Sequence, residues 1–492
     1  MKTGTGLLLM LAVLCAAGGL YSCGESTPSP SADTKAVLSE TESVTESGNV
    51  PSSPRDRSDL PEDYDLEGFT LRVVAQTNAA DGLCRLAAES ESGEKLNDTI
   101  YARNQRMMEK YHFSITESNV DDLTGEVRRL VTAGDDVYDT AVGWACSYAG
   151  SVVTENILYN LYDLENLNLS KNYWDQNLTQ ALTVGRRLYL ACGDILVQDS
   201  NESMMVILYN RSLAEDLDIE NLYEVADRGA WTMERMIAEA KAAVSDLNGD
   251  NKINEKDRMG YLYCSNNCIY PYLAAGNTSI TGTDAEGKPV LLDKLDRAVQ
   301  VCDVSSVLYD GGFSAEWSVM PDVYTTLPNL VSNKQVLFQN MNLSILRRLY
   351  RDVTAEFGIL PMPKLDESQE EYGTSVWRDF EAVTVLTTTG QPAKTGFVLE
   401  ALASDSYELN QTYFDICLQS KYTRDEESYK NCMMMLDHVR YDISFIFNFG
   451  TFYDALNREI QRGGASANIM STIEKNKGKY ESAVAAFLEN LD

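Results

Sequence analysis

The stretch that decides the fold reads FTLRVVA (residues 69–75), LNDTIYARNQRMMEKY (96–111) and FSITE (113–117). The first and third pieces have the composition of strands, and the middle piece has apolar residues at helical spacing. A second helical stretch (123–133) and the short run YDTAVGWA (138–145) follow. Strand, helix, strand, helix, strand predicts an α/β fold in which helices pack on the faces of a parallel sheet.

The same alternation resumes further along the chain. RLYLA (187–191) and MMVILY (204–209) are expected strands, and a helix is expected to begin after Thr232 as its N-cap. TDAEGKPVLL (283–292) predicts a turn between two short strands. The C-terminal third is largely helical in pattern and ends in an expected helix over 473–491.

The N-terminus predicts export and anchoring. The apolar run LLLMLAVLCAAGGL (7–20) is too short to cross a bilayer comfortably and suits a signal peptide over residues 1–22. LYSC, ending at Cys23, resembles a lipobox, so Cys23 is expected to carry the lipid; an ordinary cleaved secretory signal is the alternative. Residues 23–63, rich in Ser, Thr, Pro and Glu, are expected to form a disordered tether. The body would then sit at the extracellular face of the membrane, held by the lipid alone.

Composition excludes several classes of function. The formal net charge of −33 removes the usual electrostatic route to nucleic acid. His112 and His438 lie far apart and outside any ligand spacing, so neither a histidine-based zinc site nor a catalytic triad is expected; carboxylate chemistry stays open. An even number of body cysteines permits disulfides outside the cell, and buried thiols are equally consistent: Cys84, Cys146, Cys192, Cys264, Cys268, Cys302, Cys417 and Cys432.

The sharpest local motif is DLNGDNKINEKD, residues 246–257. Its oxygen-bearing side chains and one backbone carbonyl have the spacing that wraps a calcium ion. The expected ligands are Asp246, Asn248, Asp250, Lys252, Asn254 and Asp257. Asn251 replaces the usual glycine, which Asn tolerates because it accepts a left-handed conformation. We expect a structural ion that ties the helix starting near Trp231 to the strand at Tyr261; a solvated acidic loop is the alternative.

Longer segments, taken in order, carry a resemblance to a known family. They are YDTAVGWACSYAGSVVTENILYNLYDL (138–164), GRRLYLACGDILVQDSNESMMVILYNRSLAEDLDIENLYE (185–224) followed by Trp231-Thr232, NKQVLF (333–338) and FGILPMP (357–363). This order resembles the extracellular solute-binding proteins of bacterial ABC importers, the group that includes maltose-binding protein. Asn156 departs from the pattern, since it stands where the family usually has glycine.

The resemblance implies two α/β lobes that flank a ligand cleft and are joined by about three crossings of the chain. It implies that residues 64–188 and 340–380 form lobe 1, and that residues 189–339 and 381–492 form lobe 2. It also implies a monomeric receptor with no enzymatic activity and no organic cofactor, which hands a small solute to the transmembrane permease subunits of an importer.

Positions that match the family's cleft supply candidate ligand residues: Gln76, Thr77, Asn78, Trp144, Tyr148, Asp194, Asn340, Asn342, Trp377, Arg378, Asp379, Phe447 and Phe449. Aromatic rings interleaved with Asn, Asp and Arg fit a sugar or oligosaccharide, because rings stack on sugar faces and carboxylates accept hydrogen bonds from hydroxyls. Core packing is the alternative for each aromatic residue, and Arg378 leaves an anionic solute open. A secreted carbohydrate-active enzyme and a cell-surface carbohydrate-interaction protein remain alternative functions.

Overall fold

The computed structural model describes residues 55–77, 86–197, 200–350, 353–464 and 467–491. The predicted signal peptide, Cys23, and residues 24–54 of the predicted tether lie outside these described ranges. No helix in the described ranges is both long enough and apolar enough to span a bilayer.

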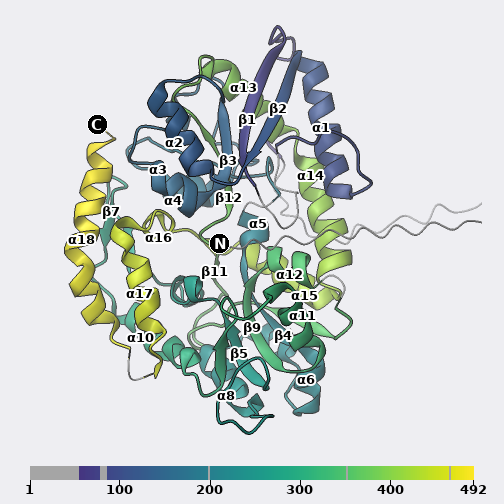
Figure 1. Cartoon of the computed structure of the whole chain (residues 1–492), viewed down its shortest axis with the longest axis vertical. Helices are drawn as coiled ribbons and strands as arrows, with labels where there is room; N and C mark the ends of the chain where they lie inside the picture. Colours follow the sequence, from purple (N-terminus) through teal and green to yellow (C-terminus); the bar gives the residue numbers. More distant parts are fainter. Residues whose placement is uncertain (1–54, 78–85, 198–199, 351–352, 465–466, 492) are drawn as a thin grey trace, which may run out of the picture. The chain divides into compact units, whose positions relative to one another are not determined.

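A four-stranded sheet of order β12-β3-β1-β2 forms the centre of the first lobe (Figure 1). β1 runs parallel to β2 and β3, whereas β12 joins β3 antiparallel. The strands are β1 (Phe69–Gln76), β2 (Phe113–Val120), β3 (Thr140–Trp144) and β12 (Glu381–Val385). The helices of this lobe are α1 (Lys95–Tyr111), α2 (Leu123–Ala133), α3 (Gly150–Val152), α4 (Gln176–Leu182) and α13 (Pro392–Ser404). The predicted order of strands and helices over residues 69–144 is confirmed.

A five-stranded sheet of order β10-β4-β9-β5-β8 forms the centre of the second lobe. Its strands are β4 (Met205–Asn210), β5 (Met259–Tyr263), β8 (Ser314–Glu316), β9 (Val336–Asn342) and β10 (Phe357–Leu360). Its helices include α6 (Arg211–Asp216), α7 (Leu222–Asp227), α8 (Met233–Ala243), α9 (Tyr270–Ala275), α10 (Asp296–Ser306), α11 (Val323–Ser332) and α12 (Leu343–Leu349). A hairpin of β6 (Thr281–Thr283) and β7 (Pro289–Leu291) and the C-terminal helices α16 (Ile443–Ile446), α17 (Phe452–Ile460) and α18 (Ile469–Glu489) complete it. The hairpin and the C-terminal helix are as predicted.

Within the part of the chain that the structure describes, three segments cross between the lobes. The first, 192–204, follows Ala191, which pairs with Val383 beside β12, and leads through α5 (Ser200–Ser203) into β4. The second, 376–380, connects β11 (Thr374–Ser375) to β12. The third is a helical run of α14 (Tyr407–Gln411), the irregular helix Thr412–Tyr422 and α15 (Glu426–Leu436), and it ends at β13 (Val439–Arg440), which pairs with β11.

The strand pairing corrects the predicted lobe boundaries. Residues 340–380 are not part of the first lobe, because β9 lies between β4 and β5 at the centre of the second sheet and β10 pairs with β4. The chain returns to the first lobe only at β12 and α13, which the prediction assigned to the second lobe. Sequence order alone does not reveal which of two sheets a returning strand will join.

Local chemistry explains where the elements begin and meet. The Thr232 side chain accepts a hydrogen bond from the Arg235 backbone N–H (3.2 Å) and caps α8 as predicted. α8 then lies so close to β5 that a Cβ on Gly260 would fall inside contact distance of the Ala240 carbonyl oxygen. Glycine is needed here because the backbones of a helix and a strand touch.

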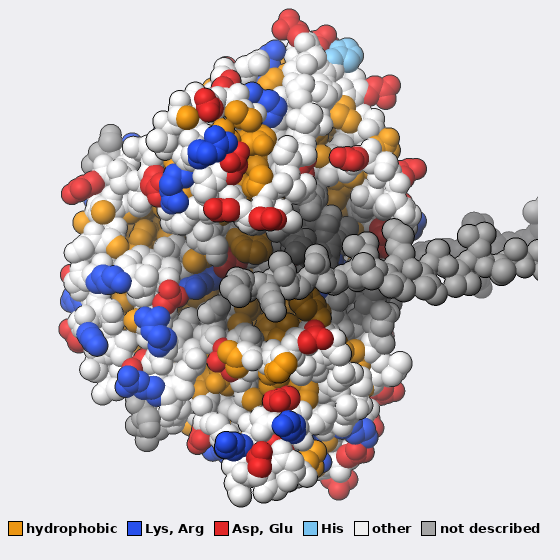
Figure 2. All heavy atoms as spheres, viewed as in Figure 1, with side chains coloured by type: hydrophobic (Ala, Val, Ile, Leu, Met, Phe, Trp, Pro, Cys, Tyr) orange, Lys and Arg blue, Asp and Glu red, His pale blue; other side chains and the backbone are white. Residues whose placement is uncertain are grey.

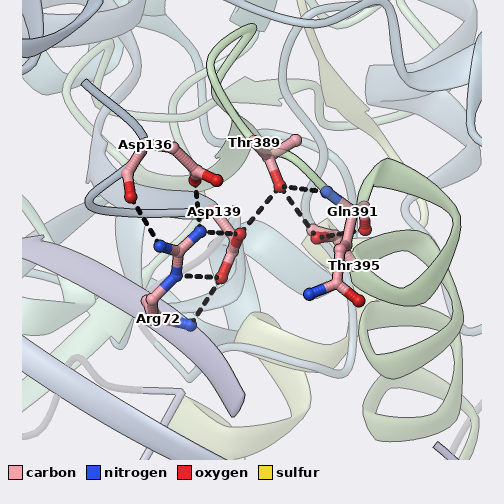
Figure 3. Close-up of polar contacts among 6 residues, drawn as sticks. All are labelled: Arg72, Asp136, Asp139, Thr389, Gln391 and Thr395. Atoms are coloured by element: carbon pink, nitrogen blue, oxygen red, sulfur yellow. Dashed lines mark hydrogen bonds and ion pairs between the residues drawn. The ribbon is translucent and has the colours of Figure 1, made fainter. Parts of the chain in front are cut away.

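A polar cluster fixes the end of the first sheet that lies away from the crossings (Figure 3). Arg72 of β1 donates to both carboxylate oxygens of the buried Asp139 (2.9 and 2.6 Å) and also contacts Asp136. Thr389, just before α13, donates to Asp139 (2.7 Å) and lies beside Thr395 of that helix. The cluster therefore ties β1, the segment before β3 and the start of α13 together, and these hydrogen bonds raise the pKa of Arg72.

The predicted extent of the tether, to residue 63, is also corrected. Residues 55–60 lie against the first lobe, where Arg55 forms an ion pair with Asp194 and Asp59 forms one with Lys171. Composition alone predicts disorder here because these residues bury little apolar surface. Their order comes instead from specific charged contacts that composition cannot show.

The described surface carries charges of both signs. On the face shown in Figure 2, acidic and basic side chains both occur over both lobes, and hydrophobic side chains border the hollow between them. Among the predicted body cysteines, Cys264 and Cys268 are separate thiols although they are four residues apart, and burial raises the pKa of both. For this pair, the alternative of buried thiols holds.

Candidate functional site

The carboxyl ends of the parallel strands in both lobes lie next to the crossing segments. β3 ends at Trp144, which pairs with Glu381 directly after the second crossing. In the second lobe β4 starts after the first crossing, and the antiparallel β9 therefore ends there at Asn342. Because β5 and β8 run parallel to β9, their carboxyl ends lie at the same edge. Ligands of open α/β sheets bind outside such strand ends, so this is the candidate site.

The turn after β3 is fastened to the second crossing by four hydrogen bonds. The backbone N–H groups of residues 145 and 146 donate to the carbonyls of Phe380 (2.9 Å) and Arg378 (3.2 Å). The backbone N–H and hydroxyl of Ser147 donate to the two oxygens of Asp379 (2.7 and 2.8 Å). Asp379 therefore fixes the turn that carries the half-buried ring of Trp144.

Arg378 is held by a carboxylate from the C-terminal helices. It donates to Asp454 of α17 (2.7 Å), which also accepts from the Asn448 side chain (2.8 Å). Burial lowers the pKa of Arg378, but the neighbouring Cys146, Asp454 and Asp379 more than offset this and hold it above its ordinary value. Arg378 stays charged, and its charge is balanced inside the site.

Cys146 lies next to this ion pair. Burial raises the pKa of its thiol to about 12, and the Asp379 carboxylate adds to the effect. The thiol is therefore neutral at physiological pH, and the environment does not activate it as a nucleophile. The carboxylates of Asp379 and Asp454 both have hydrogen-bonding partners, which hold them in place.

Of the predicted ligand residues at the end of β1, the structure describes Gln76 and Thr77. The Gln76 amide donates to the Asp121 carbonyl (2.6 Å), which holds its side chain against the loop after β2. The backbone N–H of Thr77 continues the pairing to Val120 (2.8 Å). Asn78 lies outside the described residues. Trp377 follows in the second crossing, half-buried, with its backbone N–H bonded to the Ser203 carbonyl (2.7 Å).

Three predicted aromatic ligand residues lie in the protein interior instead. Tyr148 is 1% exposed, and its hydroxyl pairs with Thr384 (3.0 Å) across the first sheet. Phe447 and Phe449 pack on each other and on Phe487, with ring centroids 5.1–5.9 Å apart. These positions are corrections, and core packing explains all three aromatic residues.

The two predicted asparagines of β9 are also buried. Asn342 accepts a hydrogen bond from the Ile345 backbone N–H (3.1 Å) and caps α12. Asn340 is buried, with its amide 3.8 Å from the Met362 sulfur. β9 is buried along its whole length, so alternation along the strand could not distinguish side chains near a ligand from core side chains.

Asp194, which was predicted to bind the solute, contacts Arg55 and Asn410 instead. Its carboxylate is 2.7 Å from the Arg55 guanidinium and accepts from the Asn410 amide (2.7 Å). Burial raises its pKa to about 6, although Arg55 and Asn410 act in the opposite direction. Sequence order gave no signal for this contact, since 139 positions separate the two charged residues.

Two pockets lie next to α4, on the side of the first crossing that faces away from β3. Ala191 pairs with β12, and Gly193 in turn pairs with Trp174, so α4 lies beyond the first crossing from β3. A pocket of about 240 Å³ contains Arg55 and Asp194 in its lining, and one of about 420 Å³ lies between α4 and the β6 hairpin. The hydroxyl of Tyr441, which lines both, donates to Asp175 (2.6 Å) and joins the two lobes.

The predicted calcium loop has a fitting geometry. Carboxylate oxygens of Asp246, Asp250 and Asp257 come within 4.8 Å of one another. Asn251 adopts a left-handed conformation (φ 61°), as the loop requires where glycine is usual. Both oxygens of Asp246 accept backbone N–H groups of the loop, from Gly249 (2.7 Å) and Asn251 (2.8 Å). Residues Ser245 and Arg258 pair at the base of the loop and join the end of α8 to β5.

Important partners in the site were missed by sequence reasoning. Ser147, Asn448 and Asp454 complete the hydrogen bonds around Arg378 and Asp379. Asp454 lies 76 positions from Arg378 on an amphipathic helix. An acidic residue on such a helix is normally solvated, so only the packing of α17 against the crossing reveals its role.

Comparison with known proteins agrees with the architecture. No protein-family model matches the sequence, and no curated protein matches it. Among solved structures, the chain resembles the galacto-N-biose/lacto-N-biose-binding protein of an ABC transporter from Bifidobacterium longum, in complex with lacto-N-biose (TM-score 0.57, 13% identity, 86% of this chain and 98% of that one). It also resembles the cyclic maltosyl-maltose-binding protein of Arthrobacter globiformis (TM-score 0.54, 14% identity, 85% and 99%).

A third similar structure has a different kind of ligand. It is a Mycobacterium tuberculosis protein in complex with glycerophosphocholine (TM-score 0.54, 13% identity, 78% of this chain and 94% of that one). The alignments span nearly the whole of each relative, so both lobes and their connections are shared. The chain therefore has the two-lobed α/β fold of the solute-binding proteins of ABC transporters.

Proposed function

We propose that this protein is an extracellular solute-binding receptor of an ABC importer. The arrangement that supports this most strongly is the fastening of Trp144, Arg378 and Asp379 at the carboxyl ends of the strands, next to the crossing segments. A solute bound there touches both lobes and favours the form in which they close on it. The carboxylates of this group are occupied by structural contacts, which favours binding over catalysis by a carboxylate pair.

The solute we propose is a neutral sugar or oligosaccharide. Arg378 is neutralised by Asp454, so the site does not offer an unbalanced positive charge to an anion. The half-buried Trp144 supplies a ring that can stack on a sugar face. Two of the similar structures hold or are named for sugars, and the glycerophosphocholine complex shows that the same fold also takes a charged, phosphate-bearing ligand.

A further part of the proposal concerns the receptor's place in the cell. Lipidation at Cys23 would hold a monomeric receptor at the outer face of the membrane, next to its permease subunits. The support is the sequence LYSC at residues 20–23 behind a short apolar run. Mass spectrometry of the membrane-extracted protein tests this, because an unmodified peptide beginning after residue 22 contradicts lipidation.

We also propose a structural calcium ion in the loop 246–257. Asp246, Asn248, Asp250, Asn254 and Asp257 would hold it through their side chains, and Lys252 through its carbonyl. The close approach of three carboxylates supports this, since without a cation they repel one another. The ion would stabilise the connection between α8 and β5 and take no part in capturing the solute.

A thermal-shift screen tests the receptor function. Oligosaccharides, monosaccharides, amino acids, peptides and phosphodiesters are each added to the purified protein, and its melting temperature is recorded. We expect at least one sugar to raise it, because a ligand that binds only the folded state stabilises that state. Each hit is then incubated with the protein and analysed for products. Cleavage of the sugar supports a carbohydrate-active enzyme instead, and a screen without any hit contradicts the sugar receptor.

A further inference from the structure

The first described residues of the chain, 55–60, lie along the first lobe. We call residues 55–60 the N-terminal strap. Asp59 pairs with Lys171 (2.8 Å) and accepts from the Asn168 amide (2.8 Å). Asp56 and Asn172 exchange two hydrogen bonds of 2.9 Å, each backbone N–H donating to the other side chain. Such reciprocal pairing fixes the register of the strap on the lobe.

The strap ends at the crossings through Arg55. Its guanidinium lies 2.7 Å from Asp194, donates to the Asn172 carbonyl (3.1 Å) and lies over the ring of Tyr407 (5.5 Å to the centroid). Asp194 is 8% exposed, so this ion pair is largely desolvated on the carboxylate side. An ion pair with one desolvated partner is stronger than a fully exposed ion pair.

Asp194 belongs to the first crossing and contacts the third. Its backbone N–H donates to the Tyr173 carbonyl (2.9 Å) of the first lobe. Its side chain accepts from Asn410 (2.7 Å) of α14, where the helical crossing begins. Leu436 and Tyr441, at the far end of that crossing, line the same pocket of about 240 Å³ as Arg55. Arg55 therefore lies where two of the three connections between the lobes converge.

We infer that the N-terminal strap is a clasp on the hinge, which restrains the first and third crossings while Arg55 is bound to Asp194. The path of the strap supports this. β1 begins at Phe69, at the end of the sheet away from the crossings, yet the chain before it runs back to Asp194. Arg55, the first described residue, therefore lies beside the crossings.

The clasp is coupled to protonation. The charged groups that face Asp194 are Arg55 and Asp175, and Asp437 lines the same pocket. Burial raises the pKa of Asp194 to about 6, and Arg55 lowers it from a higher value that the carboxyl would have alone. By linkage, docking of Arg55 is strongest when Asp194 is ionised; it strengthens as the pH rises through about 6 and weakens below it.

Hydrogen–deuterium exchange of the unliganded protein tests the clasp. R55A is compared with the native protein and with R57A, which removes an exposed arginine two positions away and serves as the matched control. In R55A we expect exchange to be about tenfold faster in the strap and in peptides that cover 191–197 and 407–418, because these segments lose the ion pair between Arg55 and Asp194. R57A leaves all three unchanged.

Other outcomes overturn the inference. If R55A frees the strap but leaves the crossing peptides unchanged, the strap is a surface attachment and no clasp. If the strap exchanges at the unprotected rate in the native protein, it is not docked at all. In the pH arm, strap exchange of the native protein, corrected for the intrinsic rate, rises between pH 7 and pH 5. D194N shows fast strap exchange at both pH values, and an unaltered pH response in D194N contradicts the role of Asp194.

Discussion

At the scale of single residues, the contact between Arg72 and Asp139 carries the largest expected effect on stability. Asp139 is fully buried and accepts from Arg72, Thr389 and the β1 backbone. R72A leaves a buried carboxylate without its cation, so we expect the free energy of unfolding to fall by about 3 kcal/mol or more. Urea denaturation followed by circular dichroism measures this.

The surface pair Arg129–Glu126 is the matched control. It is also a bidentate arginine–carboxylate contact, but Arg129 is exposed and Glu126 is only half-buried on the surface of α2. R129A should lower the free energy of unfolding by at most about 1 kcal/mol. Equal losses in R72A and R129A contradict the reading of the Arg72 cluster as a buried structural anchor.

Residue-level roles were the least predictable from sequence. Trp144, Arg378 and Asp379 come together because they flank neighbouring strands β3 and β12; their contact with a solute stays a prediction. Asp194 and Tyr148 have other partners, since ionic and aromatic side chains serve equally well in cores and clefts. Asp454 and Arg55 depend on segments far away in the chain, and no local pattern marks them.

At the scale of elements, the packing of α8 on β5 depends on Gly260. A methyl group there meets the Ala240 backbone, which cannot move without displacing the helix. We expect G260A to lower the free energy of unfolding by about 3 kcal/mol or more, because overpacking against backbone cannot be relieved by a side-chain rotation. Thermal and urea denaturation measure the loss.

Gly478 of α18 provides the control for that substitution. A Cβ at Gly478 meets nothing within 4 Å, and alanine is the better helix former. G478A should therefore be neutral or stabilising by up to about 1 kcal/mol. If G260A lowers the free energy of unfolding no more than G478A does, α8 and β5 do not pack as closely as described.

The calcium loop is the second element with a direct test. Millimolar calcium should raise the melting temperature of chelator-treated protein by about 5 °C, because binding to the folded state alone stabilises it. The double variant D246N/D250N should lose this response while D284N, in the β6–β7 turn, keeps it. A calcium response that survives in the double variant, or none in the native protein, contradicts the site.

Elements were predicted better than their assembly. Periodicity located β1, α1, β2, α2 and β3 because each buries one clear face or a continuous apolar run. The Thr232 cap was predictable because its chemistry is local; calcium binding by the loop 246–257 stays a prediction. The sequence did not predict which sheet β9, β10 and β12 join, because sheet membership depends on the path of the crossing segments.

At the scale of the whole molecule, the carboxyl ends of the parallel strands of both sheets lie next to the same crossing segments. The site that results is built from segments around residues 144, 378 and 454, and no one lobe contains it entirely. The pockets beside α4 and the docked strap lie on the other flank of the same crossings. A solute bound at the candidate site and the docked strap would therefore contact a shared set of crossing segments.

The most direct test of the account is calorimetric titration of the native protein and W144A with the sugar that gives the largest thermal shift. We predict one site per chain, no product after prolonged incubation, and an affinity at least about tenfold weaker in W144A, since a stacking ring is lost from the site. Y162A, which removes an exposed ring of the first lobe, should bind as the native protein does. Equal affinity in W144A and the native protein, or conversion of the sugar, would contradict a sugar receptor with its site at the carboxyl ends of the strands.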